Sequence, residues 1–218
     1  MIVAVSGLDG AGKSTQIDLL SKSLSGKGVR VRLLWARGGY TPGFEFIKRI
    51  LRRMLGQKAF PSGRSKQREK KLEDPLVQTI WLSLAILDLC VVWGLYIRFF
   101  DKKNSVVICD RYLNDTLLDF RRNFPNVDLS KSYLWKLLVV ITPKPDVSFL
   151  FWVPVLTSLE RSISKSEPFP DSKETLEWRL DCYLNEAIFP AQIFNRIDGR
   201  NDVKKIAEQM LATVTSKF

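Results

Sequence analysis

The stretch that decides the fold of this chain is residues 2–15, Ile-Val-Ala-Val-Ser-Gly-Leu-Asp-Gly-Ala-Gly-Lys-Ser-Thr. Residues 2–6 form an apolar, largely β-branched run, which predicts a buried strand. A glycine-rich turn follows at once, and apolar residues then recur at helical spacing over residues 14–24. The stretch therefore predicts a strand, a tight loop and a helix, the opening unit of a parallel α/β sheet.

Residues 7–15 also match the pattern Gly-x-x-x-x-Gly-Lys-Ser/Thr, in the strand-to-helix context that this pattern requires. Its glycines let successive backbone N–H groups point at phosphate oxygens, and the helix N-terminus adds partial positive charge. Lys13 supplies a cation for the β- and γ-phosphates, and the Ser14 hydroxyl is a ligand for Mg²⁺. The pattern predicts binding of ATP or GTP by Gly7, Gly10, Ala11, Gly12, Lys13, Ser14 and Thr15.

Beyond this stretch, predicted strands and helices alternate along the chain. Apolar runs predict strands at 29–35, 105–109 and 147–153, and helix-spaced apolar residues predict helices at 46–55, 134–141 and 175–189. The alternation is typical of an α/β protein with a three-layer, doubly wound parallel sheet. Neither an internal repeat nor a domain boundary stands out, so we expect a single domain over residues 1–218.

Composition restricts the chemistry and the compartment. The 218 residues include no His, which excludes Ser-His-Asp and Cys-His nucleophile systems and imidazole metal sites. The three cysteines, at 90, 109 and 182, are far apart and lie among apolar or aromatic residues. We expect reduced, mostly buried thiols in a cytoplasmic protein. The first seven residues lack the features of a signal peptide and predict a structural strand.

The positive charge is concentrated in one segment. The chain has a formal net charge of +11, and residues 48–71 contribute +9 of it, with ten Lys or Arg and one acidic residue. One interpretation is a solvated helix end followed by a loop. The other is a surface for substrate phosphates or for a polyanion, either nucleic acid or an anionic membrane. The sequence leaves both interpretations open.

Residues 76–97 form a long apolar segment of sufficient length to cross a bilayer. Asp88 lies near its centre, where an ionisable side chain costs roughly 2.5–3.5 kcal/mol to insert. Basic residues also flank both ends, so no charge asymmetry favours one orientation. The segment therefore predicts a buried core helix, which also makes a homodimer plausible.

A second motif indicates which class of ATP- or GTP-binding protein the chain resembles. Residues 106–112, Val-Val-Ile-Cys-Asp-Arg-Tyr, predict a buried strand ending in Asp110, Arg111 and Tyr112. A strand-end carboxylate beside a phosphate loop can position Mg²⁺, and the adjacent arginine can bind a phosphate. Together the two motifs resemble the thymidylate kinases, and similar pieces recur over nearly the whole chain. Those pieces lie at residues 37–43, 145–146, 159–161 and 197–199.

The resemblance implies a fold of the P-loop nucleotide kinase type and ATP- and Mg²⁺-dependent phosphoryl transfer to a nucleoside monophosphate, by default dTMP to dTDP. It implies an acceptor-side segment at about 37–97 and a lid at about 161–178. The implied catalytic residues are Lys13, Asp9, Arg111, Arg161 and Lys165, with Lys173 as another candidate lid cation. The implied acceptor-binding residues are Asp9, Arg37, Trp81, Arg111 and Tyr112, and the implied Mg²⁺ ligands are Ser14 and Asp110.

The chain departs from the family pattern on the acceptor side. No Arg or Lys occurs between Lys71 and Arg98, and Leu89 stands about where the resemblance implies a base-reading arginine. Trp81 could still stack on the acceptor base. Two alternatives therefore stand beside dTMP phosphorylation. One is a related P-loop kinase for another small phosphate or hydroxyl acceptor, and the other is a non-catalytic P-loop module that binds a polyanion through residues 48–71.

Overall fold

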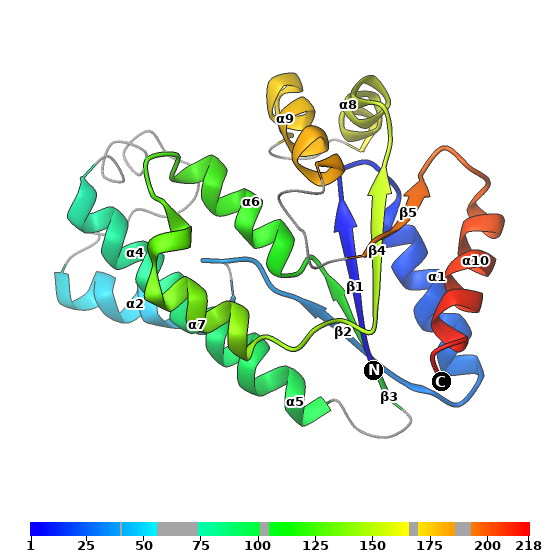
Figure 1. Ribbon diagram of the computed structural model, residues 1–218, viewed down its shortest axis with the longest axis horizontal. Coiled ribbons are helices and arrows are strands. Elements are labelled where there is room, and N and C mark those ends of the chain that lie inside the picture. The colour runs from blue at the N-terminus through cyan, green and yellow to red at the C-terminus, as the bar shows by residue number, and fades with distance from the viewer. Residues whose placement is uncertain (40, 56–73, 101–104, 166–169, 186–192) are drawn as a thin grey trace. The chain divides into compact units, whose positions relative to one another are not determined.

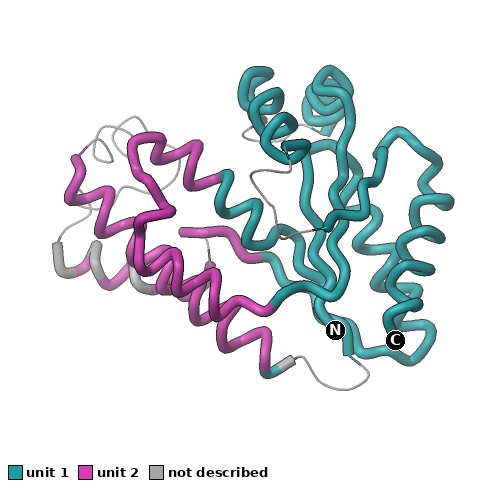
Figure 2. The backbone as a smooth tube through the Cα atoms, in the orientation of Figure 1, with its two compact units in different colours: residues 1–35, 99–118, 144–218 teal, residues 36–98, 119–143 magenta. Residues whose placement is uncertain are grey.

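The computed structural model describes residues 1–39, 41–55, 74–100, 105–165, 170–185 and 193–218. It divides into two compact units (Figure 2): Met1–Trp35, Phe99–Leu118 and Lys144–Phe218 form unit 1, and Ala36–Arg98 with Asp119–Pro143 form unit 2. That the two units together form one kinase domain over residues 1–218 stays a prediction.

Unit 1 contains a five-stranded parallel sheet in the order β2-β3-β1-β4-β5 (Figure 1). Its strands are β1 (Ile2–Gly7), β2 (Arg30–Trp35), β3 (Ser105–Asp110), β4 (Val147–Trp152) and β5 (Asn195–Asp198). The pairing of Val5 with Asp110 and of Gly7 with Phe151 aligns the carboxyl ends of the three central strands. The predicted α/β fold with a parallel sheet is confirmed.

Helices bury both faces of this sheet. On one face, α1 (Lys13–Gly26) and α10 (Val203–Thr215) supply Leu20, Met210 and other apolar residues to a core with Val3 and Phe149. On the other face, Leu150 of β4 packs with residues of α6 (Leu113–Asn123) and α9 (Lys173–Leu184). The alternation of side chains along each strand therefore produces three layers. The helix α8 (Val155–Ser164) follows β4 directly.

Unit 2 consists of helices in the described residues. They are α2 (Pro42–Leu55), α4 (Pro75–Leu89), a π-helix (Cys90–Tyr96) that leads into α5 (Ile97–Phe100), the end of α6, a 3₁₀ turn (Leu129–Lys131) and α7 (Tyr133–Ile141). Asp74 caps α4 by accepting from the N–H groups of Leu76 and Val77, and Pro75 occupies the first turn, where no N–H is needed.

The apolar segment 76–97 lies in these consecutive helices. Among the described residues, one helix, Pro75–Phe99, is long and apolar enough to cross a membrane by length and composition, and more than half of its apolar window is buried. Trp93 and Leu89 are fully buried, and Asp88 is 8% exposed. The prediction of a buried core helix fits this burial.

Several elements differ from the sequence-based expectation. The predicted helix at 175–189 ends at Leu184, and residues 186–192 lie outside the described residues. The helix expected from residue 46 begins at Pro42, because proline fits the first helical turn. The strand β5 and the helices α6, α8 and α10 were not predicted. α6 was missed because its buried face includes Asp115, Thr116 and Asp119 rather than an apolar stripe.

Candidate active site

The loop between β1 and α1 has the backbone of a phosphate-binding loop. Gly7, Gly10 and Gly12 have φ values of +133°, +70° and +93°. Such values strain residues that carry a Cβ, and a Cβ on Gly7 would lie 2.0 Å from the carbonyl oxygen of Phe151. The side chains of Ser14 and Thr15 at the start of α1 are exposed. The predicted loop geometry is therefore present, with its hydroxyls open to solvent.

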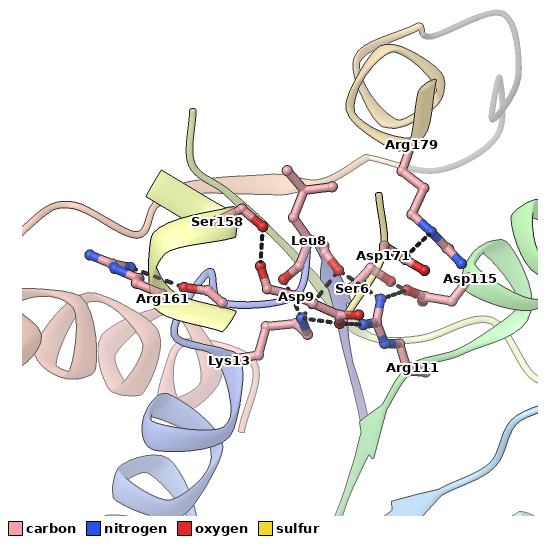
Figure 3. A network of polar contacts seen from close by, with 12 residues as sticks. Ser6, Leu8, Asp9, Lys13, Arg111, Asp115, Ser158, Arg161, Asp171 and Arg179 are labelled. Carbon is pink, nitrogen blue, oxygen red and sulfur yellow. Dashed lines mark hydrogen bonds and ion pairs between the residues drawn. The ribbon is translucent and has the colours of Figure 1, made fainter. Parts of the chain in front are cut away.

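Lys13 lies under this loop, with its side chain only 8% exposed (Figure 3). Its Nζ donates to the carbonyl oxygens of Gly7, at 3.2 Å, and Leu8, and it lies 3.7 Å from Asp9 Oδ1. Burial, reinforced by the nearby Arg111 charge, lowers the pKa of Lys13 from 10.5 to about 8. The ammonium group is thus held at the loop by neutral carbonyls and one carboxylate.

This lowered pKa predicts a pH dependence of ATP binding. Phosphate is attracted by the protonated lysine, so affinity should fall as pH rises above about 8. The dissociation constant should approach an increase of about ten-fold per pH unit above that pKa. Calorimetric titration with ATP, between neutral pH and the pKa of free lysine, measures this dissociation constant. The control is Lys13→Arg, which stays charged, so its dissociation constant should not change with pH. A dissociation constant of the unmodified protein that does not change with pH would contradict the prediction.

Linkage gives the same lysine an effect on stability with a definite sign. Between about 8 and 10.5 the unfolded chain binds more protons at Lys13 than the folded protein does. The Lys13 contribution to the free energy of unfolding therefore rises with pH across that window.

Arg111 and Asp9, two predicted site residues that lie far apart in the sequence, are in direct contact. Arg111 Nη2 donates to Asp9 Oδ1, and Arg111 Nη1 donates to the carbonyl oxygen of Gly7 at 2.6 Å (Figure 3). The backbone N–H of Arg111 donates to Val5 O at 3.0 Å, which fixes the residue beside β1. The strand-end arginine and the phosphate loop therefore form one polar cluster in unit 1.

The donor set at the loop fits Mg²⁺. The described residues include no group of three or more His, Cys, Asp or Glu side chains arranged as metal ligands. Mg²⁺ in nucleotide sites, however, takes one or two protein oxygens and completes its shell with phosphates and water. Ser14 offers an exposed hydroxyl, and Asp110 ends β3 with a partly exposed carboxyl. Burial raises the pKa of Asp110, and the charges of Lys13 and Arg111 oppose that shift.

The predicted lid cations have different positions. Arg161, on α8, donates from Nη1 to the carbonyl oxygens of Gly10 (3.1 Å) and Gly199 (3.0 Å), so in this structure it braces the loop backbone. Lys165 is exposed at the end of α8. Lys173 begins α9 and pairs with Glu177 at 3.7 Å. Residues 166–169 of the predicted lid lie outside the described residues.

In unit 2, Arg37 is held by a buried carboxylate. Both Arg37 Nε and Nη2 donate to Asp119, the second at 2.8 Å, and the Asp119 side chain is 7% exposed. Such a two-point contact fixes the plane of the guanidinium. Asp119 was not among the predicted site residues.

Trp81 lies in an aromatic cluster of unit 2. Its ring centroid is 5.4 Å from that of Phe44 and 5.2 Å from that of Phe124, and the residue is 6% exposed. A Cβ on Gly39 would come within 2.4 Å of the indole, so glycine permits this close approach. Packing of the acceptor-side segment is thus one clear role of Trp81, and stacking on a base stays a prediction.

Leu89, which stands about where the resemblance implies a base-reading arginine, is an apolar core residue. Leu89 has no exposed surface, and its neighbour Asp88 accepts a hydrogen bond from Thr41 Oγ1. Burial raises the pKa of Asp88. Of the basic segment 48–71, only residues 48–55 are described; there Lys48 pairs with Glu45 and donates to Gly39 O at 3.2 Å.

Three further residues of the cluster in unit 1 escaped prediction. Ser158 Oγ donates to Asp9 O at 2.6 Å, and both Tyr112 N and Tyr183 OH donate to Asp115. Tyr112, which was predicted to bind the acceptor, is 2% exposed. Asp115 lies close after the Asp-Arg-Tyr motif, and this short distance in the sequence is the one local indication that Asp115 belongs to the site. Tyr183 and Ser158 carry no local signal, because only long-range contacts bring Tyr183 to Asp115 and Ser158 to Asp9.

Comparison with known proteins supports the resemblance that the motifs suggested. No family model matches the chain. The chain is 29% identical over 215 residues to the thymidylate kinase of Bartonella henselae, with 95% of this chain and 92% of that protein covered. It is 28% identical to that of Ruegeria pomeroyi, over 98% of this chain and 94% of that protein. It is 25% identical to the thymidylate kinase of Afipia carboxidovorans, over 99% of this chain and 89% of that protein. The similarity thus extends over essentially the whole chain.

Proposed function

We propose, from the premise that this chain is a relative of the thymidylate kinases along nearly its whole length, that it transfers the γ-phosphoryl group of ATP to a nucleoside monophosphate, with dTMP as the acceptor and dTDP as the product. The observation that carries the proposal is the cluster in unit 1, where Lys13, Asp9 and Arg111 meet at the phosphate loop. A polyanion-binding module without catalysis is not favoured, because the similar proteins of known function are kinases.

Phosphoryl transfer passes through a loose transition state, so positioning and electrostatics supply most of the acceleration. In this proposal the loop N–H groups and Lys13 bind the β- and γ-phosphates of ATP. Ser14 and Asp110 would hold Mg²⁺, which when bound neutralises charge on the phosphate oxygens. Arg161 supports the loop backbone from α8, a contact that fits a supporting role during transfer.

On the acceptor side, Arg111 of unit 1 binds the acceptor phosphate in this proposal, and Asp9 binds the acceptor sugar. Arg37 of unit 2 is proposed separately as an acceptor-binding residue. Support comes from the preorganisation of both arginines, since each is held by buried or half-buried carboxylates. A guanidinium with a fixed plane can bind a phosphate through two parallel hydrogen bonds. In this proposal the acceptor base stacks on the indole of Trp81, which lies in the aromatic cluster of unit 2.

The test is an ADP-release assay with ATP, Mg²⁺ and each nucleoside monophosphate in turn. Turnover with dTMP at a higher kcat/KM than with the other acceptors is the expected result. Turnover with another nucleotide and none with dTMP would transfer the proposal to that acceptor class. An absence of turnover with every nucleoside monophosphate would refute the kinase assignment.

A cytoplasmic homodimer completes the proposal. Among the described residues the three cysteines form no disulfide, and Cys109 and Cys182 are buried. On Pro75–Phe99, exposed apolar residues recur at helical spacing: Leu76, Ile80, Leu87, Val91 and Leu95. Such a stripe on one helix face is typical of a protein interface.

This interface predicts the effect of a charge. Leu95→Glu should convert the dimer into a monomer, because an unpaired carboxylate would be buried at the interface. Light scattering after size-exclusion chromatography measures the mass. Phe218→Glu, at another exposed apolar residue, is the control and should stay dimeric. A monomeric unmodified protein, or a dimeric Leu95→Glu variant, would contradict the interface.

A further inference from the structure

Asp115, in the first turn of α6, is a buried carboxylate with four donors from three parts of unit 1. Oδ1 accepts from Arg111 Nη1 at 3.0 Å and from Tyr183 OH at 2.5 Å. Oδ2 accepts from Ser6 Oγ at 2.6 Å and from Tyr112 N at 3.0 Å. The residue is 1% exposed, so it reaches no ligand in solution directly. Its charge is matched by the guanidinium of Arg111 and by three neutral donors.

The partner of this carboxylate, Arg111, has a strained backbone. Its φ is +77°, a left-handed conformation in which a residue that carries a Cβ is strained. Such strain persists where surrounding contacts determine the conformation, and these sites gather at active centres. Here the backbone N–H is held by Val5 O and the guanidinium by Asp115, Gly7 O and Asp9. Of the two carboxylates that hold the Arg111 side chain, Asp115 is more deeply buried than Asp9.

Tyr183 connects a second element to this contact. It lies on α9, 68 residues after Asp115, and is 3% exposed. Burial and the charge of Asp115 raise its pKa well above 10, so its hydroxyl stays a donor at neutral pH. α9 also includes residues 173–178 of the predicted lid. The helix that carries the end of the lid is thus hydrogen-bonded to the carboxylate that holds Arg111.

We propose that Asp115 is a positioning residue for the acceptor phosphate: it fixes the guanidinium of Arg111 beside the phosphate loop and ties that guanidinium to α9 through Tyr183. This inference rests on the proposed function, in which Arg111 binds the acceptor. Its consequence is selective. Removing the charge of Asp115 should impair use of the acceptor. ATP binding depends instead on the loop N–H groups and Lys13, none of which Asp115 contacts in the described hydrogen bonds. The charge of Asp115 raises the pKa of Lys13, but burial and the charges of Arg111, Asp9 and Asp110 all act on that pKa more strongly.

The test compares Asp115→Asn with the unmodified enzyme in steady-state assays that vary dTMP and ATP separately. The amide keeps the shape but removes the charge and places N–H groups where donors point. We expect KM for dTMP to rise by roughly ten-fold or more, from loss of a charged hydrogen bond, with KM for ATP changed by less than about two-fold. Asp181→Asn, at an exposed position of α9, makes the same change of charge as a control and should leave both constants unaltered.

Tyr183→Phe keeps the test decisive if Asp115→Asn does not fold, because it removes one hydroxyl without changing the shape of the ring. It should raise KM for dTMP by about three-fold and leave KM for ATP unchanged. An unmodified enzyme inactive on every nucleoside monophosphate overturns the proposed function and this inference with it. An active enzyme whose variants lose only thermal stability, or lose dTMP and ATP use equally, overturns the positioning role alone.

Discussion

Lys13→Ala is expected to lower kcat for phosphoryl transfer by roughly a thousand-fold or more, since it removes a preorganised charge from the transferring phosphates. The fold should survive the change. Lys13 is buried with its pKa lowered to about 8, so its charged form costs free energy in the folded state. Removing that charge should leave the midpoint of thermal unfolding equal or higher. Steady-state kinetics and calorimetry on the same sample measure the two quantities.

The matched control is Lys22→Ala, which removes a lysine from the same helix. The Lys22 side chain is 72% exposed. Its one described ion pair is with Asp18, which is also exposed and lies one helical turn earlier. Such a pair contributes little to stability, so activity and stability should both stay close to those of the unmodified protein. Turnover of Lys13→Ala at the unmodified rate would refute the assignment of the loop.

Arg111→Ala is expected to raise KM for the acceptor by about a hundred-fold, the loss expected for a charged two-point contact, with ATP affinity changed far less. Asp9→Asn should act in the same direction, because Asp9 holds the guanidinium and faces the acceptor in the proposal. Varying dTMP and ATP separately distinguishes the two substrates. Equal losses of ATP affinity in both variants would contradict the acceptor role.

The strained backbone of Arg111 allows a paired test. Arg111→Gly removes the same side chain as Arg111→Ala but accepts a φ of +77° without cost. The two variants should therefore lose acceptor use equally, and the glycine variant should be more stable by about 1 kcal/mol. Chemical unfolding curves measure the difference. An alanine variant of equal or greater stability would show that the conformation is not strained.

The phosphate loop and Asp-Arg-Tyr could be predicted from sequence because each is a local pattern with a fixed structural context. Residues 7–15 need a strand before them and a helix after them, and both are present. The meeting of Asp9 with Arg111 follows from the parallel pairing of β1 with β3, which any doubly wound sheet would bring about at that edge.

Asp115 and Asp119 could not be assigned in the same way. Two acids four residues apart in a polar helix look like an exposed, solvated face. Their burial depends on partners that only the tertiary structure supplies, Tyr183 for the first and Arg37 for the second. The lid role that the resemblance implies for Arg161 stays a prediction. The hydrogen bonds from Arg161 to the carbonyl oxygens of Gly10 and Gly199 could not be predicted, because they join residues far apart in the sequence.

The central claim, transfer of the ATP γ-phosphoryl group to dTMP, is tested most directly by following a labelled γ-phosphate. The unmodified protein with Mg²⁺, labelled ATP and dTMP should move the label into dTDP, with one ADP formed for each dTDP. The Lys13→Ala variant should form both products roughly a thousand-fold more slowly, or slower still. Formation of ADP with the label released as inorganic phosphate, or the absence of labelled dTDP, would contradict the account.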